Sequence, residues 1–315
     1  MPEGIGPRRV PSRWRRETYY GRPQLKPAPF NNSLVGSYVF LAGLSGAAQL
    51  LATLLDLARG RLAASAVRRG RYLALLAPTI GAACLIGDLH TPQRFYNMLR
   101  LYKSTSPMSI GSWLLVAFGA FAVPTAIVQF LTERVRMLRP MRAVARVAQI
   151  PASLAGAGLS TYTASLFSAT SAPGWAAAPK SLAVRFGAAS VASAAVAMSL
   201  GEGRRRTGRD LDAIAVTALA VELAATLASD ETQRRAGIGG GPSNEQIVGI
   251  IVPLGLFLTS LLLPRHRSRA LSAMASLGTL GASLAMRIGV MEEGEQSARL
   301  PETSMRFAQP DNLPR

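Results

Sequence analysis

Four ionisable or proton-donating side chains interrupt long apolar stretches of this sequence. Asp88, Tyr162 and Glu222 carry groups that exchange protons or donate hydrogen bonds, and Arg287 carries a positive charge that can balance a carboxylate. A tyrosine hydroxyl and carboxylates are suited to general acid–base work. Charged groups in a bilayer are costly and usually face a bundle interior, a partner or a water-filled cavity. The pattern therefore predicts a proton-handling site inside a helical bundle.

The apolar stretches that surround these residues predict the fold. Each has roughly the 20 residues needed to cross a bilayer core, although the second is short and needs its flanking residues. They are residues 34–55, 72–87, 110–131, 150–172, 182–201, 211–228, 247–263 and 270–290. We therefore expect an all-α, polytopic integral membrane bundle of about eight transmembrane helices over residues 34–290. A basic flexible arm (1–33) precedes it and a polar tail (291–315) follows.

Composition excludes several classes of protein. The formal charge of +18 comes from arginines in the short connections, as in membrane-protein loops, and no nucleic-acid-binding motif accompanies it. Cys84 is the single cysteine, so neither a disulfide nor an iron–sulfur cluster is expected within the chain. Because His90 and His266 fall at opposite membrane faces, they cannot share a haem. No metal site is predicted.

The distribution of Lys and Arg predicts the orientation. These residues are more frequent in the connections after the first, third, fifth and seventh segments, which places those connections in the cytoplasm and both termini outside. The basic N-terminal arm favours the opposite orientation, but tails translocate less predictably than short loops. With the termini outside, the four polar residues above gather in the outer half of the bundle, together with Asn32 and Arg185.

The polar loop between the second and third segments has its own pattern. Phe95, Met98, Leu99 and Tyr102 recur at helical spacing, which is typical of a short helix lying in the headgroup plane. The hydroxyl-rich residues 104–109 can cap the helix that begins near residue 110.

This loop carries a resemblance to a known family. DLHTPQRFYNMLR (88–100) and KSTSPMSIGSW (103–113) resemble the signature D-L-G-R-P-x-R-F-x-N-M-L-R and K-P-T-S-P-M-S-x-G-x-W of the polysulfide-reductase membrane subunits (NrfD/PsrC-like). His90-Thr91 replaces Gly-Arg and Ser104 replaces proline. YTASLFSATSAPGW (162–175) is similar to the family's Y-T-G-V-L-L-S-A-T-A-x-P-x-W, with Ala164 in place of glycine, and SYVFLAGLSG (37–46) resembles its opening helix. The resemblance covers the first four segments well and the last four only faintly.

The resemblance implies a function and a site. Family members are quinol-handling subunits of the bacterial cytoplasmic membrane that dock an iron–sulfur subunit, which exchanges electrons with a molybdopterin catalytic subunit. By resemblance, Tyr162 and Asp88 line a quinone pocket, and Asn32, which precedes the first segment on the same side of the membrane, is expected to join them. The exposed residues expected to dock the partner are Arg94, Asn97, Arg100 and Lys103. The chain itself then carries no catalytic cofactor, because its electron carrier belongs to the partner.

Depth in the membrane, rather than resemblance, suggests the proton route. Asp88 would exchange protons with the outer surface, and Glu222 would be a buried proton station whose charge Arg287 balances. A proton-linked transporter or channel without redox partners is the alternative, and Pro124 and Pro253 are mild signs of the broken helices such proteins use. A third possibility is a structural anchor in which Glu222 and Arg287 only neutralise each other.

Overall fold

The computed structural model describes residue 25, residues 30–235, residue 238, residues 244–262 and residues 265–308. Most of the predicted N-terminal arm and the end of the C-terminal tail lie outside these residues. Every regular element within the described part is helical, which confirms the all-α prediction. The eight long helices there are α1 (Asn32–Arg59), α2 (Ala64–Gly87), α3 (Pro107–Arg134), α4 (Arg142–Ser168), α6 (Pro179–Ser199), α7 (Arg205–Arg235), α8 (Asn244–Leu262) and α9 (Arg265–Arg299).

Five short helices connect or extend the long ones. They are η1 (Gly60–Ala63), η2 (Pro92–Leu99), η3 (Arg136–Met141), α5 (Pro173–Ala176) and α10 (Pro301–Phe307). Ser106 caps α3, since its hydroxyl accepts from the backbone N–H of Ser109. The hydroxyl-rich residues therefore cap this helix as predicted, although the helix begins at Pro107 rather than near Ile110.

Several of these helices are suited to a bilayer. Five stretches of the described chain are long and apolar enough to span one, and the first of them, Asn32–Gly87, contains both α1 and α2. Large apolar side chains also point outward, including Leu76, Ile127, Leu154 and Leu277. An outward apolar surface of this kind is typical of helices in contact with hydrocarbon. The protein is therefore a multi-pass helical membrane protein.

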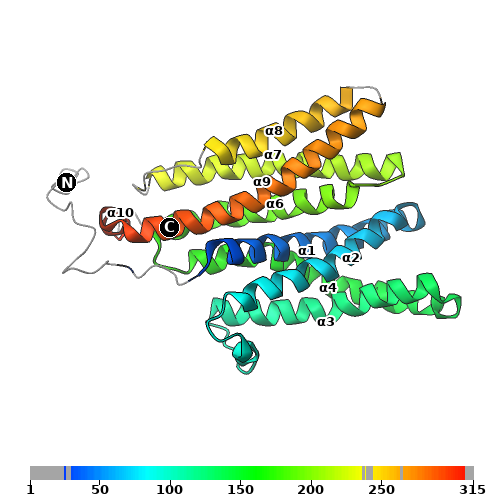
Figure 1. The fold of residues 1–315 in the computed structure, drawn as a ribbon, viewed down its shortest axis with the longest axis horizontal. Coiled ribbons are helices and arrows are strands. Elements are labelled where there is room, and N and C mark those ends of the chain that lie inside the picture. Colours follow the sequence, from blue (N-terminus) through cyan, green and yellow to red (C-terminus); the bar gives the residue numbers. More distant parts are fainter. Residues whose placement is uncertain (1–24, 26–29, 236–237, 239–243, 263–264, 309–315) are drawn as a thin grey trace, which may run out of the picture.

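The long helices form two groups that pack side by side (Figure 1). Helices α1–α4 form one group and α6–α9 the other, and α1 and α4 contact α6 while α1 also contacts α9. Within the first group, α1 and α4 approach closely, because a Cβ on Gly46 would overlap the carbonyl oxygen of Gly156. Ser160, one turn further along α4, donates to the carbonyl of Gly43 at 3.3 Å. Small residues on both helices thus allow the backbones of α1 and α4 to approach closely.

The helices run between two ends of the bundle (Figure 1). We call the end that holds the starts of α1 and α3, the end of α2 and the helix η2 the loop end. The opposite end, with the connections from α1 to α2, α6 to α7 and α8 to α9, is the turn end. α10 lies at the loop end.

Two helices differ in extent from the prediction. α2 begins at Ala64, not at residue 72, so Arg71 belongs to the helix rather than to a connection. α9 continues past residue 290 to Arg299, so the first part of the predicted tail is helical. In both cases charged residues made the ends of the helices look like loop.

Candidate functional site

Tyr162 lies on α4 near the loop end, where its half-buried ring covers the beginning of α3. A Cβ on Gly111 would overlap the Cζ and hydroxyl oxygen of Tyr162. Only glycine leaves room for the phenol at this position. The glycine of the loop motif and the tyrosine of the fourth segment, far apart in sequence, are thus parts of one contact.

A second tyrosine accompanies Tyr162. Tyr38, on α1, is buried and lies within electrostatic range of Tyr162. Neither hydroxyl has a hydrogen-bond partner in the described part of the chain. Two hydroxyl donors without a protein partner near the loop end are suited to a ligand that carries carbonyl oxygens.

Asp88 stands at the same end, directly after α2. Its Oδ1 accepts a hydrogen bond from the backbone N–H of Asn31 at 2.8 Å, and Asn31 in turn caps α1 through the N–H groups of Ser33 and Leu34, both at 3.1 Å. The half-buried carboxylate thus fixes the start of α1 against the end of α2. No hydrogen bond between described residues joins Asp88 to Tyr162, although both lie toward the loop end.

Asn32 is engaged on another side of α1. Its Nδ2 donates to Oε2 of Glu295 on α9 at 2.9 Å, and Glu295 also binds Arg299. This contact ties the start of α1 to the second helix group. Asn32 and Tyr38, the residue within electrostatic range of Tyr162, thus both lie on the first part of α1.

The residues predicted to dock a partner all lie on the loop that carries η2. The side chains of Arg94, Asn97, Arg100 and Lys103 are exposed. η2 is a 3₁₀ helix; Phe95 within it and Tyr102 after it are 44% and 64% exposed. An exposed surface that combines basic and aromatic side chains is typical of an interaction site.

A partly buried polar network connects α6, α8 and α9 in the second helix group. The Nη2 of Arg185 donates to Oε1 of Gln246 at 2.7 Å, and Nε2 of Gln246 donates to Oε1 of Glu293 at 2.7 Å. Sequence reasoning noted Arg185 but missed Gln246 and Glu293, because both fall at the polar ends of their helices. Their roles depend on partners about 50 residues or more away, which no local pattern reveals.

Glu222 and Arg287 lie close to this network. Glu222 is 3% exposed and Arg287 is 1% exposed, and the two interact electrostatically, as do Glu222 and Arg185. They form no ion pair. Instead, Nη2 of Arg287 donates to the carbonyl of Phe186 at 2.8 Å, and its guanidinium lies 3.8 Å from the centre of the Phe186 ring. Nε and Nη1 of Arg287 have no partner among the described residues.

A cavity of about 480 Å³ gives Glu222 a polar surrounding. It lies between α7, α8 and α9 and is lined by four carboxylates, those of Glu222, Glu245, Glu292 and Glu293. Ser283 also lines the cavity, and its buried hydroxyl has no partner within the described residues. Carboxylates that share a cavity with an unpaired hydroxyl can exchange protons with water there.

A second buried cluster lies at the turn end of the first helix group. The Nη2 of Arg71 donates to Oε1 of Gln149 at 2.6 Å and to Oδ2 of Asp56 at 3.3 Å, and Nε2 of Gln149 donates to the same Asp56 oxygen at 3.0 Å. Removing one member of such a buried pair leaves an uncompensated charge. Sequence analysis missed the cluster because it assigned Arg71 to a connection.

The Gly111 contact leads to a stability prediction. Gly111→Ala should lower the free energy of unfolding by about 1–3 kcal/mol, because the added methyl group displaces the Tyr162 ring in a packed region. Thermal unfolding of the purified protein in detergent measures this. Gly119→Ala is the matched control on the same helix, since a Cβ there meets nothing within 4 Å. A Gly111→Ala melting temperature at or above that of the control would contradict the packing described.

These features define a class: a multi-pass helical membrane protein with tyrosine hydroxyls and a carboxylate near one end of the bundle, beside an exposed basic loop. The family model for the polysulphide reductase NrfD matches residues 23–229. The chain therefore belongs to the NrfD family, and it is a membrane subunit that partners with other redox subunits. The match includes Asp88, Tyr162 and Glu222 but ends before Arg287. No curated protein matches the chain.

Proposed function

We propose that this chain is the quinone- or quinol-binding membrane subunit of a multi-subunit oxidoreductase. The observation that carries the proposal is the pair of unpartnered hydroxyls of Tyr38 and Tyr162, which lie toward the loop end where the exposed loop enters α3. A quinone head has two carbonyl oxygens that need hydrogen-bond donors, and its reduction needs protons. The residues present fit both needs.

Each residue of this site has a distinct role in the proposal. Tyr162 donates its hydroxyl hydrogen to a quinone carbonyl, and Tyr38 supplies a second donor. Asp88 exchanges the proton with the outer surface through the carboxylate oxygen that does not bind Asn31. Asn32, which the sequence places in the quinone site, acts beside it by holding α9 against α1 through Glu295.

Electrons leave or enter through a partner, because this chain is proposed to carry neither haem nor an iron–sulfur cluster. The exposed basic surface of Arg94, Arg100 and Lys103, with Asn97 between them, would dock an iron–sulfur subunit. That subunit would relay electrons to or from a molybdopterin-type catalytic subunit. Docking there keeps the transfer distance short, since the loop leads directly into α3, which packs against Tyr162.

The membrane placement completes the proposal. All eight long helices cross the bacterial cytoplasmic membrane, with the loop end and both termini outside. The apolar parts of α2 and α8 are short, so these two helices span the membrane only if the polar residues at their ends are part of the span. Glu222 serves as a buried proton station in the acid-lined cavity, with Arg185 and Arg287 as positive charges near it.

The same cavity favours a second candidate, proton-linked transport without redox partners. Four carboxylates around about 480 Å³ of space suit the passage of protons or cations as well as proton delivery to a quinone. Co-purification separates the two functions. An oxidoreductase subunit should retain a cysteine-rich iron–sulfur protein, whereas a transporter should purify without one and show solute counterflow.

Binding of a quinone analogue tests the proposal directly. Tyr162→Phe should weaken binding to the purified protein about tenfold, because one neutral hydrogen bond contributes about 1–1.5 kcal/mol. Tyr72→Phe is the matched control, since its hydroxyl contacts Glu133 near the turn end at 3.3 Å. Fluorescence quenching or isothermal titration measures both affinities. Equal affinities in the two variants, or no binding to the wild type, would refute the quinone site.

A further inference from the structure

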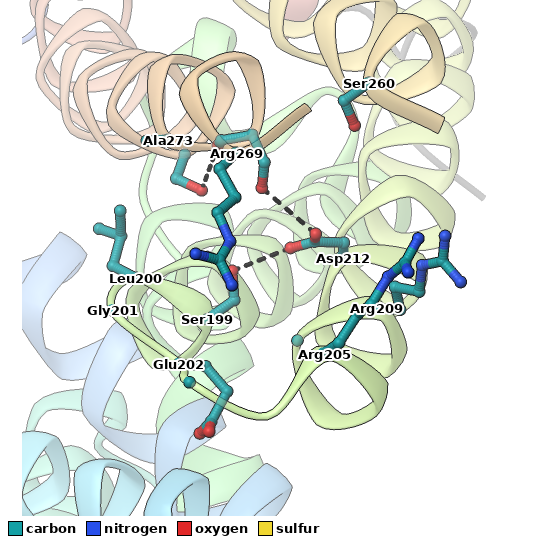
Figure 2. A pocket seen from close by; sticks show the side chains of 14 residues that line it. Ser199, Leu200, Gly201, Glu202, Arg205, Arg209, Asp212, Ser260, Arg269 and Ala273 are labelled. Atoms are coloured by element: carbon teal, nitrogen blue, oxygen red, sulfur yellow. Dashed lines mark hydrogen bonds between the residues drawn. The ribbon is translucent and has the colours of Figure 1, made fainter. Parts of the chain in front are cut away.

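Another cavity lies at the turn end of the second helix group (Figure 2). Its volume is about 650 Å³, and it is formed where α6 ends, α7 begins, α8 ends and α9 begins. Gly201 lines the cavity, and its φ of 72° permits the sharp turn between α6 and α7. It is remote from Tyr162 and Asp88, which lie toward the loop end.

The cavity has an excess of positive charge. Arg205 and Arg209 from α7 and Arg269 from α9 line it, and Figure 2 shows them around Asp212. In the described part of the chain, neither Arg209 nor Arg269 forms an ion pair or a hydrogen bond. The neighbouring arginines differ: Arg59 pairs with Asp210 at 2.9 Å.

The two acids that line the cavity are engaged by other groups. Asp212 accepts hydrogen bonds from Ser199 at 2.8 Å and from Ser272 at 3.2 Å. Glu202 turns toward α2, where its carboxylate accepts from Ser65 at 2.8 Å and pairs with Arg69 at 3.4 Å. The guanidinium groups of Arg209 and Arg269 are therefore left to bind an anion that the chain does not supply.

The position of the cavity indicates the kind of anion. It lies at the ends of helices that are apolar enough to span a bilayer, so it stands at the depth of the phospholipid phosphates. The first turn of α7 also lines the cavity, and the positive end of its helix dipole favours a phosphate. Deeper along α8 and α9, Leu258, Met274 and Leu277 are 48%, 59% and 63% exposed and can contact acyl chains.

We propose that this cavity is a binding site for the phosphate group of an anionic phospholipid, held by Arg209 and Arg269. The hydroxyls of Ser199 and Ser272 keep Asp212 from competing for these arginines. Free phosphate shares the headgroup chemistry, but it would not use the apolar side chains beside the cavity. The inference is independent of the proposed redox function, because none of its residues belongs to the quinone site.

Native mass spectrometry of the delipidated full chain tests this proposal. Phosphatidylglycerol should bind the wild type, and the double variant Arg209→Gln/Arg269→Gln should bind it roughly 30-fold more weakly, because each basic side chain near an anionic headgroup contributes about a fivefold gain. The matched control is Arg139→Gln/Arg206→Gln, which removes the same charge from two exposed arginines that do not line the cavity. The control should keep the wild-type affinity within about twofold.

Two further probes identify the source of the phosphate. Phosphatidylcholine, which has no net charge, should bind the wild type and the double variant equally weakly. Inorganic phosphate at millimolar concentration should not displace phosphatidylglycerol. Equal loss of phosphatidylglycerol binding in the control and the double variant, no loss in either, or displacement by inorganic phosphate would overturn the lipid site. Circular dichroism of both variants verifies that they remain folded.

Discussion

Tyr162→Phe should reduce quinol-coupled turnover of the assembled complex by about 10²- to 10⁴-fold, the range that a positioned acid–base group contributes. The substitution removes only the hydroxyl that faces the proposed quinone carbonyl. The ring that covers Gly111 is retained, so the packing of α4 on α3 should be unchanged. The measurement is the rate of electron exchange between a quinol analogue and the iron–sulfur partner in isolated membranes.

Two controls separate catalysis from assembly. Tyr72→Phe should retain the wild-type rate, because Tyr72 lies near the turn end of α2. The iron–sulfur partner should co-purify with the Tyr162→Phe variant, since the exposed loop around Arg94 and Lys103 is unaltered. Wild-type turnover in the Tyr162→Phe variant would remove this residue from the mechanism, even if the family assignment stands.

The positions of the helices could be predicted from the sequence because the length of each apolar stretch determines where a membrane-spanning helix forms. All eight predicted segments lie within or largely overlap the long helices of the described chain. The errors are at helix ends, where basic or acidic residues continue the helix. Arg71 shows the reason: its charge is stabilised inside the bundle by Asp56 and Gln149, which belong to other helices. A sequence pattern detects the charge but not the partners that allow it to be buried.

The candidate site was predicted unevenly for the same reason. Family resemblance placed Tyr162, Asp88 and the docking loop, and the structure puts them toward one end of the bundle. Tyr38 could not be singled out, since it is one more aromatic residue in an apolar helix until its hydroxyl is found near Tyr162 without a partner. The pairing of Glu222 with Arg287 rested on depth alone; the two side chains interact electrostatically, and the hydrogen bonds of Arg287 go to Phe186 and Ser190.

The arrangement of the two helix groups suggests a division of labour. The first group holds the tyrosines and the exposed basic loop, whereas the second holds the acid-lined cavity and the network of Arg185, Gln246 and Glu293. Asn32 and Glu295 join the groups at the loop end. Under the proposed function, substitutions in the first group should disturb quinone binding and partner docking, whereas substitutions in the second group should disturb the buried proton station at Glu222.

Glu222→Gln should abolish most proton movement during turnover, with a fall of about 100-fold or more, because glutamine keeps the shape and hydrogen bonding of the side chain but cannot release a proton. Glu222 is buried in the cavity wall. Bulk water therefore cannot take over its proton-carrying role as easily as it could for an exposed carboxyl. Proteoliposomes that contain the whole complex and a pH-sensitive dye report the movement. Glu222→Asp should restore part of it, and Glu302→Gln, at an exposed position of α10, should leave it unchanged. Undiminished proton movement in Glu222→Gln would make the cavity a structural feature, and it would leave Tyr162 and Asp88 as the groups that handle protons.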